Sequence, residues 1–177
     1  MSLSVIENNI EGLAVPIVNS LNTYAEYKTQ VIASPTANAI LAFLEQSPKN
    51  VGILFIDKDF DSMYIPPFVL PDDVSFDGGI AVVNVLSPIN IGGTDIPLGV
   101  SLMHELGHAK QFIEAPVDFE NKYKEAMGQV KSNYPSELTR KKKGEKISQL
   151  IIENENVALH EAPICDDLGL PFRKRYD

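Results

Sequence analysis

The chain of 177 residues contains no tryptophan, one cysteine and three histidines. The single cysteine, Cys165, excludes an internal disulfide bond and is compatible with folding in a reducing compartment. A domain of this length buries roughly two thirds of the surface that its unfolded chain exposes. An apolar core can therefore stabilise the fold without disulfide bonds.

Other absences exclude whole classes of protein. No stretch approaches the roughly 18 apolar residues that a membrane-spanning helix needs. Residues 1–4 do not begin a basic and then apolar segment, so no Sec-type signal peptide is expected. The 15 basic residues against 24 acidic ones give a net charge of −9, which argues against nucleic acid as a partner. The one basic run, residues 140–143, is interpreted as a solvated loop, with a docking patch for an acidic partner as the alternative.

Turn residues and apolar runs predict a mixed α and β fold. Ser34 and Pro35 are typical of a helix start, and this helix is expected to end near residue 46. Apolar and β-branched runs predict strands at residues 51–56 and 80–86. The proline-rich segment 62–73 is expected to be an irregular loop.

Three further segments have helical patterns. The first covers residues 98–112, and the second covers residues 121–130. The third is a long amphipathic stretch, residues 145–168, which Pro163 should kink or divide because proline cannot make the regular helical hydrogen bond.

The sequence His104-Glu105-Leu106-Gly107-His108 carries the strongest functional signal. Residues four apart share one face of a helix, so both imidazoles can bind a single zinc ion. Glu105 lies about 100° round the helix and is expected to act as a general base. Two histidines and a glutamate in an apolar helix would be costly without such a role. Gly107 is expected to permit close approach by a neighbouring backbone.

A catalytic zinc site needs a third protein ligand. Helical phase favours Glu153, with Glu155 as the alternative and His160 directed further away. Glu161 falls inside the apolar stripe, where an unpaired carboxylate is expensive, so Arg173 is expected to pair with it. The alternative is that Pro163 turns the chain early and leaves Glu161 in solvent.

The zinc motif, the helix that starts at Ser34 and the ending Gly169-Leu170-Pro171-Phe172-Arg173-Lys174-Arg175-Tyr176 together resemble the NleD-like effector metallopeptidases. The resemblance implies a single zincin-like α+β domain with a small sheet packed on the zinc helix. Residues 1–33 would form an N-terminal helical segment, and residues 34–177 would form the catalytic domain.

The ending is also similar to that of clostridial neurotoxin light chains. That likeness implies that Glu161 supports a zinc ligand, and that Arg173 and Tyr176 stabilise the oxyanion. Both families carry a Glu-Glu pair near the third ligand, whereas this chain has Glu153-Asn154-Glu155.

These features predict a zinc endopeptidase with glutamate as the third ligand. The zinc ion would lower the pKa of a water molecule towards ~7, and Glu105 would take its proton during attack on the scissile carbonyl. Residues 80–86 are expected to be an edge strand that pairs with an extended substrate.

The family likeness also implies a biological setting. The protein would be made in the bacterial cytoplasm and secreted or injected without a Sec signal, to cleave a protein of a target cell as an effector or toxin. A chaperone or an immunity protein would be a further partner. Two other functions stay open: an ImmA-like regulatory peptidase, which shares the zinc helix without needing the Arg173 and Tyr176 ending, and a binding module with a structural zinc site.

Overall fold

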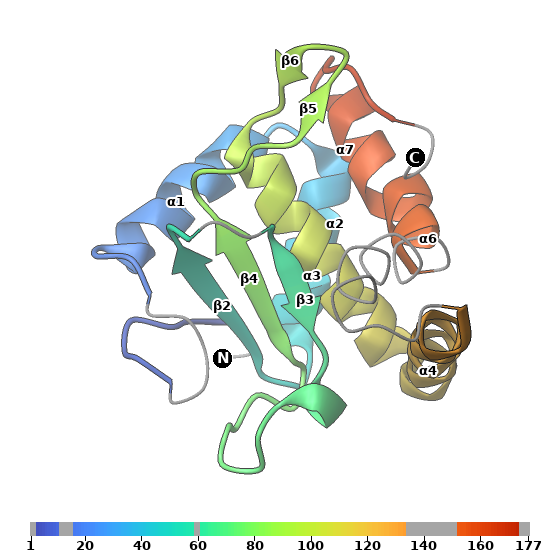
Figure 1. Ribbon diagram of the computed structural model, residues 1–177. Helices are drawn as coiled ribbons and strands as arrows, with labels where there is room; N and C mark the ends of the chain where they lie inside the picture. The colour runs from blue at the N-terminus through green and yellow to red at the C-terminus, as the bar shows by residue number, and fades with distance from the viewer. Residues whose placement is uncertain (1–2, 11–15, 59–60, 134–151, 174–177) are drawn as a thin grey trace.

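The computed structural model describes residues 3–10, 16–58, 61–133 and 152–173 (Figure 1). The basic run at residues 140–143 and Tyr176 lie outside the described residues. None of the helices in the described part of the chain has the length and apolar character needed to cross a membrane.

A four-stranded sheet in the order β1-β2-β4-β3 forms the centre of the fold. β1 (Leu3–Val5), β2 (Val51–Ile56) and β4 (Ile80–Asn84) are parallel, and β3 (Met63–Ile65) runs antiparallel to β4. Every residue of β2 and β4 is buried, which explains the unbroken apolar run of β2 and that of residues 80–83 in β4. The strands predicted at residues 51–56 and 80–86 are confirmed, except that the second ends at Asn84.

Two sequence-based expectations about this sheet are wrong. The segment 62–73 is not wholly irregular, because it contains β3 and a short 3₁₀ turn at Pro67–Val69. The predicted edge strand, β4, is also not at an edge, since it pairs with β2 on one side and with β3 on the other. Among the described residues, the two edge strands of this sheet are β1 and β3.

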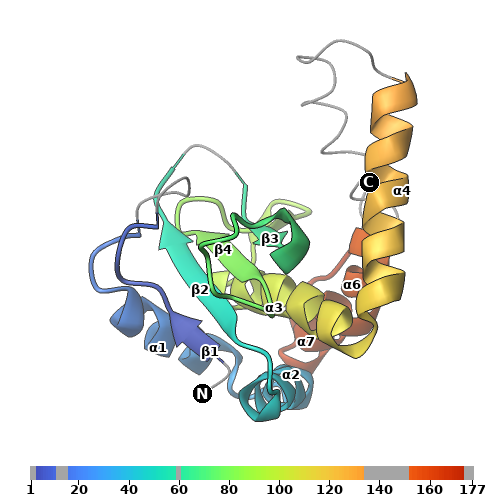
Figure 2. The same ribbon diagram turned by 90° about the horizontal axis from the view of Figure 1, so that it is seen from below.

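The first three helices of the chain pack on one face of the sheet (Figure 2). An apolar core forms between the strands and the helices α1 (Ser20–Val31), α2 (Pro35–Gln46) and α3 (Leu98–Glu114). Within it, α3 contacts β4 and also both α1 and α2. The opposite face is covered by partly buried loop side chains: Ile10, Leu70, Val74 and Phe76. α3 is thus held between the sheet and two helices.

The predicted start of α2 at Ser34 and Pro35 is confirmed, whereas α4 starts earlier than predicted. The Ser34 side chain accepts a hydrogen bond from the Ala37 amide at 3.0 Å, and Pro35 occupies the first turn. α4 (Pro116–Asn133) begins five residues before the predicted helix, because Pro116 starts it directly after Ala115.

The N-terminal segment is not only helical, because its first residues form β1, which pairs in register with β2. α1 packs on α3 in the main core. The described residues of this segment, 3–10 and 16–33, therefore contribute to the same sheet and core as the rest of the described chain.

The helix is not divided at Pro163, because the backbone angles stay helical at Asn156, Val157, Glu161 and Ala162. A short helix, α6 (Asn154–Asn156), continues into a π-helical turn at Val157–Glu161, and α7 (Ala162–Asp167) follows with Pro163 in its first turn. The π-helical turn directly before Pro163 is a local change of the helical hydrogen-bond pattern, of the kind that accommodates a residue without an amide donor. The chain between β4 and α3 forms a small antiparallel hairpin of β5 (Asn90–Ile91) and β6 (Thr94–Asp95).

Candidate metal centre

Helix α3 carries His104, Glu105 and His108 in its buried middle. Their exposed fractions are 4%, 5% and 2%, and the apolar neighbours Leu102, Met103 and Leu106 are fully buried. The polar side chains are therefore fixed in a water-poor environment by the core that surrounds the helix.

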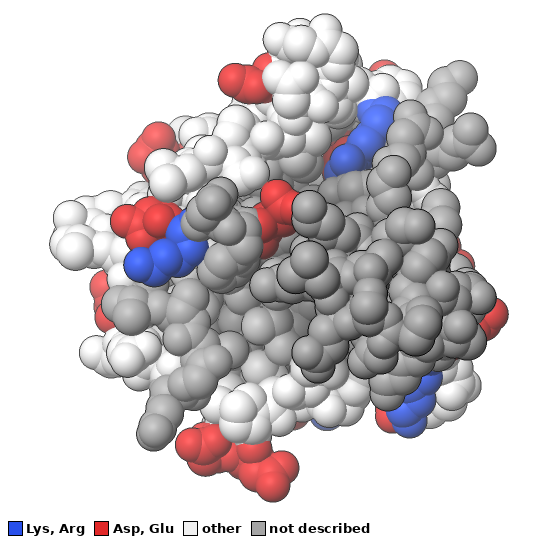
Figure 3. All heavy atoms as spheres, in the orientation of Figure 1, with Lys and Arg blue, Asp and Glu red and all other residues white. Residues whose placement is uncertain are grey.

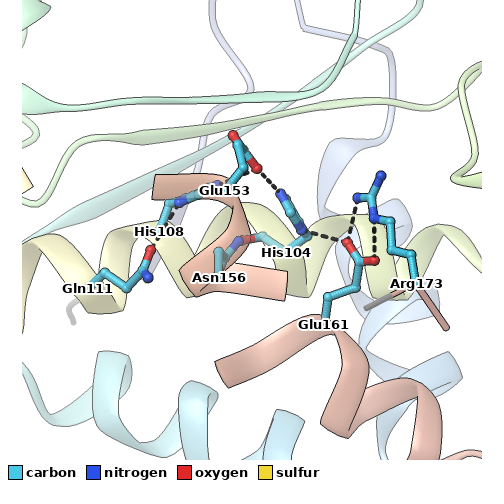
Figure 4. A network of polar contacts seen from close by, with 7 residues as sticks. All are labelled: His104, His108, Gln111, Glu153, Asn156, Glu161 and Arg173. Atoms are coloured by element: carbon cyan, nitrogen blue, oxygen red, sulfur yellow. Dashed lines mark hydrogen bonds and ion pairs between the residues drawn. The ribbon is translucent and has the colours of Figure 1, made fainter. Parts of the chain in front are cut away.

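The carboxylate of Glu153 meets both histidines (Figure 4). Its Oε2 atom lies 2.8 Å from His104 Nε2 and 3.1 Å from His108 Nε2. The contact with His108 is not in hydrogen-bond geometry, and His108 Nε2 has no other hydrogen-bond partner in the described part of the chain. Two imidazole nitrogens and one carboxylate oxygen thus converge on a single point, although 49 residues separate His104 from Glu153.

The carboxylate of Glu153 and the two imidazoles influence one another's protonation. Burial opposes ionisation of His104, but the carboxylates of Glu153 and Glu161 outweigh it and raise the pKa of His104 well above its ordinary value. Burial likewise opposes ionisation of Glu153, but the two histidines hold its pKa far below its ordinary value. A buried carboxylate between two imidazoles requires positive charge, which either a proton or a divalent cation can supply. The donor set therefore fits a metal ion.

Glu161 and Arg173 form a second layer behind His104. Glu161 Oε2 lies 2.7 Å from His104 Nδ1, and Arg173 donates from Nε and Nη2 to the same carboxylate at 2.7 Å each. Glu161 is fully buried, so the alternative that left it in solvent is wrong, and the predicted pairing with Arg173 is confirmed. This partner fixes the orientation of the His104 ring and directs Nε2 towards Glu153.

Gln111 and Tyr64 support His108 in a similar way, and the sequence did not point to either. His108 Nδ1 lies 3.1 Å from Gln111 Oε1, within the same helix. The Tyr64 ring stacks on the His108 ring with a centroid separation of 6.3 Å, and its hydroxyl donates to the Gly78 carbonyl at 2.7 Å. The three-residue spacing from His108 could have identified Gln111, whereas Tyr64 reaches the site only through the sheet.

Asn156 is a further polar residue that the sequence did not single out. It is fully buried, and its Nδ2 donates to the main-chain oxygen of His104 at 2.8 Å. A β-carbon at Gly107 would conflict with Asn156 and would lie 2.7 Å from His160 Cδ2. Gly107 therefore accommodates two side chains, and not the neighbouring backbone that we expected.

The alternative ligands lie elsewhere. Glu155 is bonded to Lys122 at 2.7 and 2.8 Å on the outer side of α6. His160 packs against Gly107, on the flank of α3, and burial lowers its pKa. Among the candidates named from the sequence, only Glu153 has its carboxylate between the two histidines.

A cleft of about 260 Å³ opens beside these residues, and His104, Glu105 and Arg173 line it together with Ser101. Ser101 is 2% exposed, and its hydroxyl has no hydrogen-bond partner within the described residues. Burial raises the pKa of Glu105 to about 7. The cleft thus presents a carboxyl group that can exchange a proton near neutral pH. Acidic side chains also predominate on the face of the molecule drawn in Figure 3, in keeping with the net charge.

The buried group of His104, Glu105 and His108 could hold a metal ion, since each residue offers a ligand atom and these atoms lie within 4.8 Å of one another. Tyr176, which was predicted to stabilise the oxyanion, lies outside the described residues. Comparisons of the chain with protein-family models, with curated proteins and with solved structures found no match.

Proposed function

We propose that this chain is a zinc-dependent endopeptidase in which His104, His108 and Glu153 hold the metal. The observation that carries the proposal is the approach of both imidazole Nε2 atoms to one oxygen of Glu153, at 2.8 and 3.1 Å. Two imidazoles and one carboxylate are a ligand set of catalytic zinc sites, which keep a further position open.

The cleft is the reason to prefer a catalytic site to a structural one. Structural zinc sites are closed by four protein ligands, whereas His104 and Glu105 line an open hollow here. When bound, zinc supplies Lewis-acid polarisation of a substrate carbonyl and acidifies water. Glu105 lines the same cleft beside His104, which suits it to take a proton from attacking water and to pass it to the leaving amine.

Arg173 is proposed to stabilise the developing oxyanion, together with Tyr176. Arg173 lines the same cleft as His104 and is held by two bonds to Glu161, so its charge is fixed in position. One well-placed donor of this kind contributes about 3 kcal/mol to transition-state stabilisation.

A peptide substrate fits the geometry of the sheet edge. β3 pairs with β4 on one side and has no partner strand on the other within the described residues. Its neighbour Ser62 lines the cleft, and its residue Tyr64 stacks on His108. We expect an extended substrate to pair with β3, because exposed strand edges bind peptides through main-chain hydrogen bonds.

The role as an effector or toxin inside a target cell rests only on the family resemblance. The ImmA-like alternative differs in one testable respect, since it does not need the C-terminal ending. Tyr176→Phe, which leaves the contact between Arg173 and Glu161 in place, should greatly lower activity in the effector proposal and leave it unchanged in the regulatory one.

The test of the proposal is metal content and cleavage measured together. Wild-type protein, His104→Ala and Glu105→Gln would be loaded with zinc, dialysed and analysed by elemental mass spectrometry, and cleavage of proteins in a cell lysate would be read by peptide N-terminus sequencing. One zinc per wild-type chain, none in His104→Ala, and zinc without cleavage in Glu105→Gln is the expected result. A folded wild type that binds no added zinc, or a Glu105→Gln variant that cleaves normally, would overturn it.

A further inference from the structure

Asn156 connects the two helices that must cooperate in the metal site. Glu153 comes from the segment that begins α6, and the two histidines come from α3. Asn156 follows Glu153 by three residues, so both side chains leave the same face of their helix. One of them meets the imidazole of His104 at 2.8 Å, and the other meets the main-chain oxygen of His104, also at 2.8 Å.

The His104 oxygen can take this second bond. A carbonyl oxygen has two lone pairs, and inside α3 one of them is used by the helical hydrogen bond from the amide four residues later. The Nδ2 group of Asn156 therefore attaches to a fixed main-chain atom of the residue that also faces Glu153. A contact with a rigid backbone defines the position of α6 more tightly than contacts between apolar side chains, which tolerate sliding.

Gly107 provides the space for this attachment. Any larger residue would place its β-carbon against Asn156 and His160, as the distances above show. The absence of a side chain at Gly107 thus lets the asparagine reach the helix backbone.

Packing alone does not account for asparagine at position 156. Asn156 is fully buried, and its Oδ1 atom has no hydrogen-bond partner in the described part of the chain. A buried acceptor without a partner is destabilising, and an apolar side chain would avoid that cost. Asparagine at this position supplies the Nδ2 donor to His104, although its Oδ1 atom is unsatisfied.

We infer that Asn156 is a positioning residue of the metal site, which sets the distance between Glu153 and the two histidines by anchoring α6 to the backbone of His104. The inference rests on the proposed zinc site and adds a determinant of its affinity and geometry. Metal sites require ligand positions within about 0.2 Å of their ideal distances, so loss of the anchor should weaken metal binding even in a protein that remains folded.

The experiment compares Asn156→Ala with Val157→Ala, in which a neighbouring, fully buried apolar residue loses packing but no side-chain hydrogen bond. The affinity for Zn²⁺ would be measured by competition with a chromophoric chelator, at a temperature at which circular dichroism shows all metal-free proteins to be folded. Co²⁺ would then replace Zn²⁺, because the intensity of its visible absorption bands reports the coordination geometry. Thermal unfolding of the metal-free proteins would measure the purely structural effect.

We expect Asn156→Ala to weaken Zn²⁺ binding by about 10- to 100-fold, the range for loss of an outer partner of a metal ligand, and to alter the Co²⁺ spectrum. Val157→Ala should lower the unfolding temperature and leave both metal readouts near wild type. If Asn156→Ala does not fold, Asn156→Leu roughly keeps the side-chain size, loses the amide donor without adding a buried charge, and serves in the same comparison.

Equal Zn²⁺ affinities and equal Co²⁺ spectra for the folded Asn156 and Val157 variants would overturn the positioning role while leaving the proposed function intact. Failure of the wild type to bind Zn²⁺ would instead remove the proposed function and this inference together. The two failures are therefore distinguishable.

Discussion

The carboxylate of Glu155 is bonded to the ammonium group of Lys122 at 2.7 and 2.8 Å, on the side of α6 that faces away from the paired histidines. Glu153, two residues earlier, turns its carboxylate towards those histidines. The two glutamates that the helical pattern could not fully separate therefore have different environments, and a matched pair of variants can distinguish them.

We expect Glu153→Gln to weaken zinc binding by at least the ~100-fold that loss of an outer partner can cost, because a ligand atom itself is lost. Glu155→Gln should leave zinc affinity unchanged and alter stability by no more than about 0.5 kcal/mol, as for other surface changes. Chelator competition measures the affinity. Loss of zinc in Glu155→Gln alone would contradict the assignment of the third ligand.

Arg173 should matter for stability even before any metal is bound. Glu161 is fully buried, and without Arg173 its carboxylate would keep only the contact with His104, at a cost of about 3 kcal/mol, the lower end for breaking a buried ion pair. Arg173→Ala should lower the free energy of unfolding of metal-free protein by about that amount, and Arg173→Lys should recover only part of it, because lysine lacks the planar fork.

Urea unfolding measures this difference, with Lys124→Ala as the control. Lys124 forms an exposed pair with Glu120 on α4, and such pairs contribute at most about 1 kcal/mol. An Arg173→Ala variant as stable as Lys124→Ala would show that the contact with Glu161 does not hold the charge in the folded protein.

The ring and the hydroxyl of Tyr64 make different contacts, so two substitutions can test them separately. Its ring stacks on His108, while its hydroxyl bonds to Gly78 away from the cleft. Tyr64→Phe should keep zinc affinity and lose about 1 kcal/mol of stability, the usual net value of one hydrogen bond. Tyr64→Ala should lose both. Zinc affinity that falls equally in the two variants would assign the hydroxyl a role in the site.

The contact between α2 and α7 should be sensitive to acid. Ser34 donates to Asp167 at 2.6 Å and the Thr36 amide donates to the same oxygen at 3.1 Å, and these hydrogen bonds lower the pKa of Asp167. A carboxyl group whose pKa is lowered by folding stabilises the protein above its unfolded pKa of about 3.9. That contribution is lost as the pH falls through the lower pKa of the folded state.

Asp167→Asn should therefore be less stable than wild type at pH 7, with a difference that shrinks below pH ~4. Thermal unfolding of the metal-free proteins between pH 7 and pH 3 measures it. Asp166→Asn, at the exposed neighbouring position, is the control and should show a smaller difference at pH 7. A difference for Asp167→Asn that does not change with pH would exclude the carboxylate as its cause.

The parts of this fold that the sequence predicts are those fixed by local chemistry. α3 follows from its apolar periodicity, α2 from Ser34 and Pro35, and β2 from an unbroken apolar run. Glu153 and the Glu161–Arg173 pair could be identified because helical phase and the cost of a buried charge are also local arguments.

The parts that the sequence does not predict depend on contacts between distant segments. β3 has only three residues and is followed by Pro66 and Pro67, so its pairing with β4 decides its structure. The same holds for β1, and for the order of strands that puts β4 inside the sheet. Asn156 shows no signal on its own, because its significance arises only where α6 lies against Gly107.

The separation of 49 residues between His104 and Glu153 has a consequence for the integrity of the molecule. A metal ion bound by both residues would link two segments that are far apart in the sequence. A ligand that binds only the folded state stabilises that state by mass action. Chelation would then loosen the whole C-terminal region as well as the ligand set, since α6 and α7 follow Glu153 directly. Under the proposed function, the same ion that activates the protein would also decide whether its last helices stay docked and resist proteolysis.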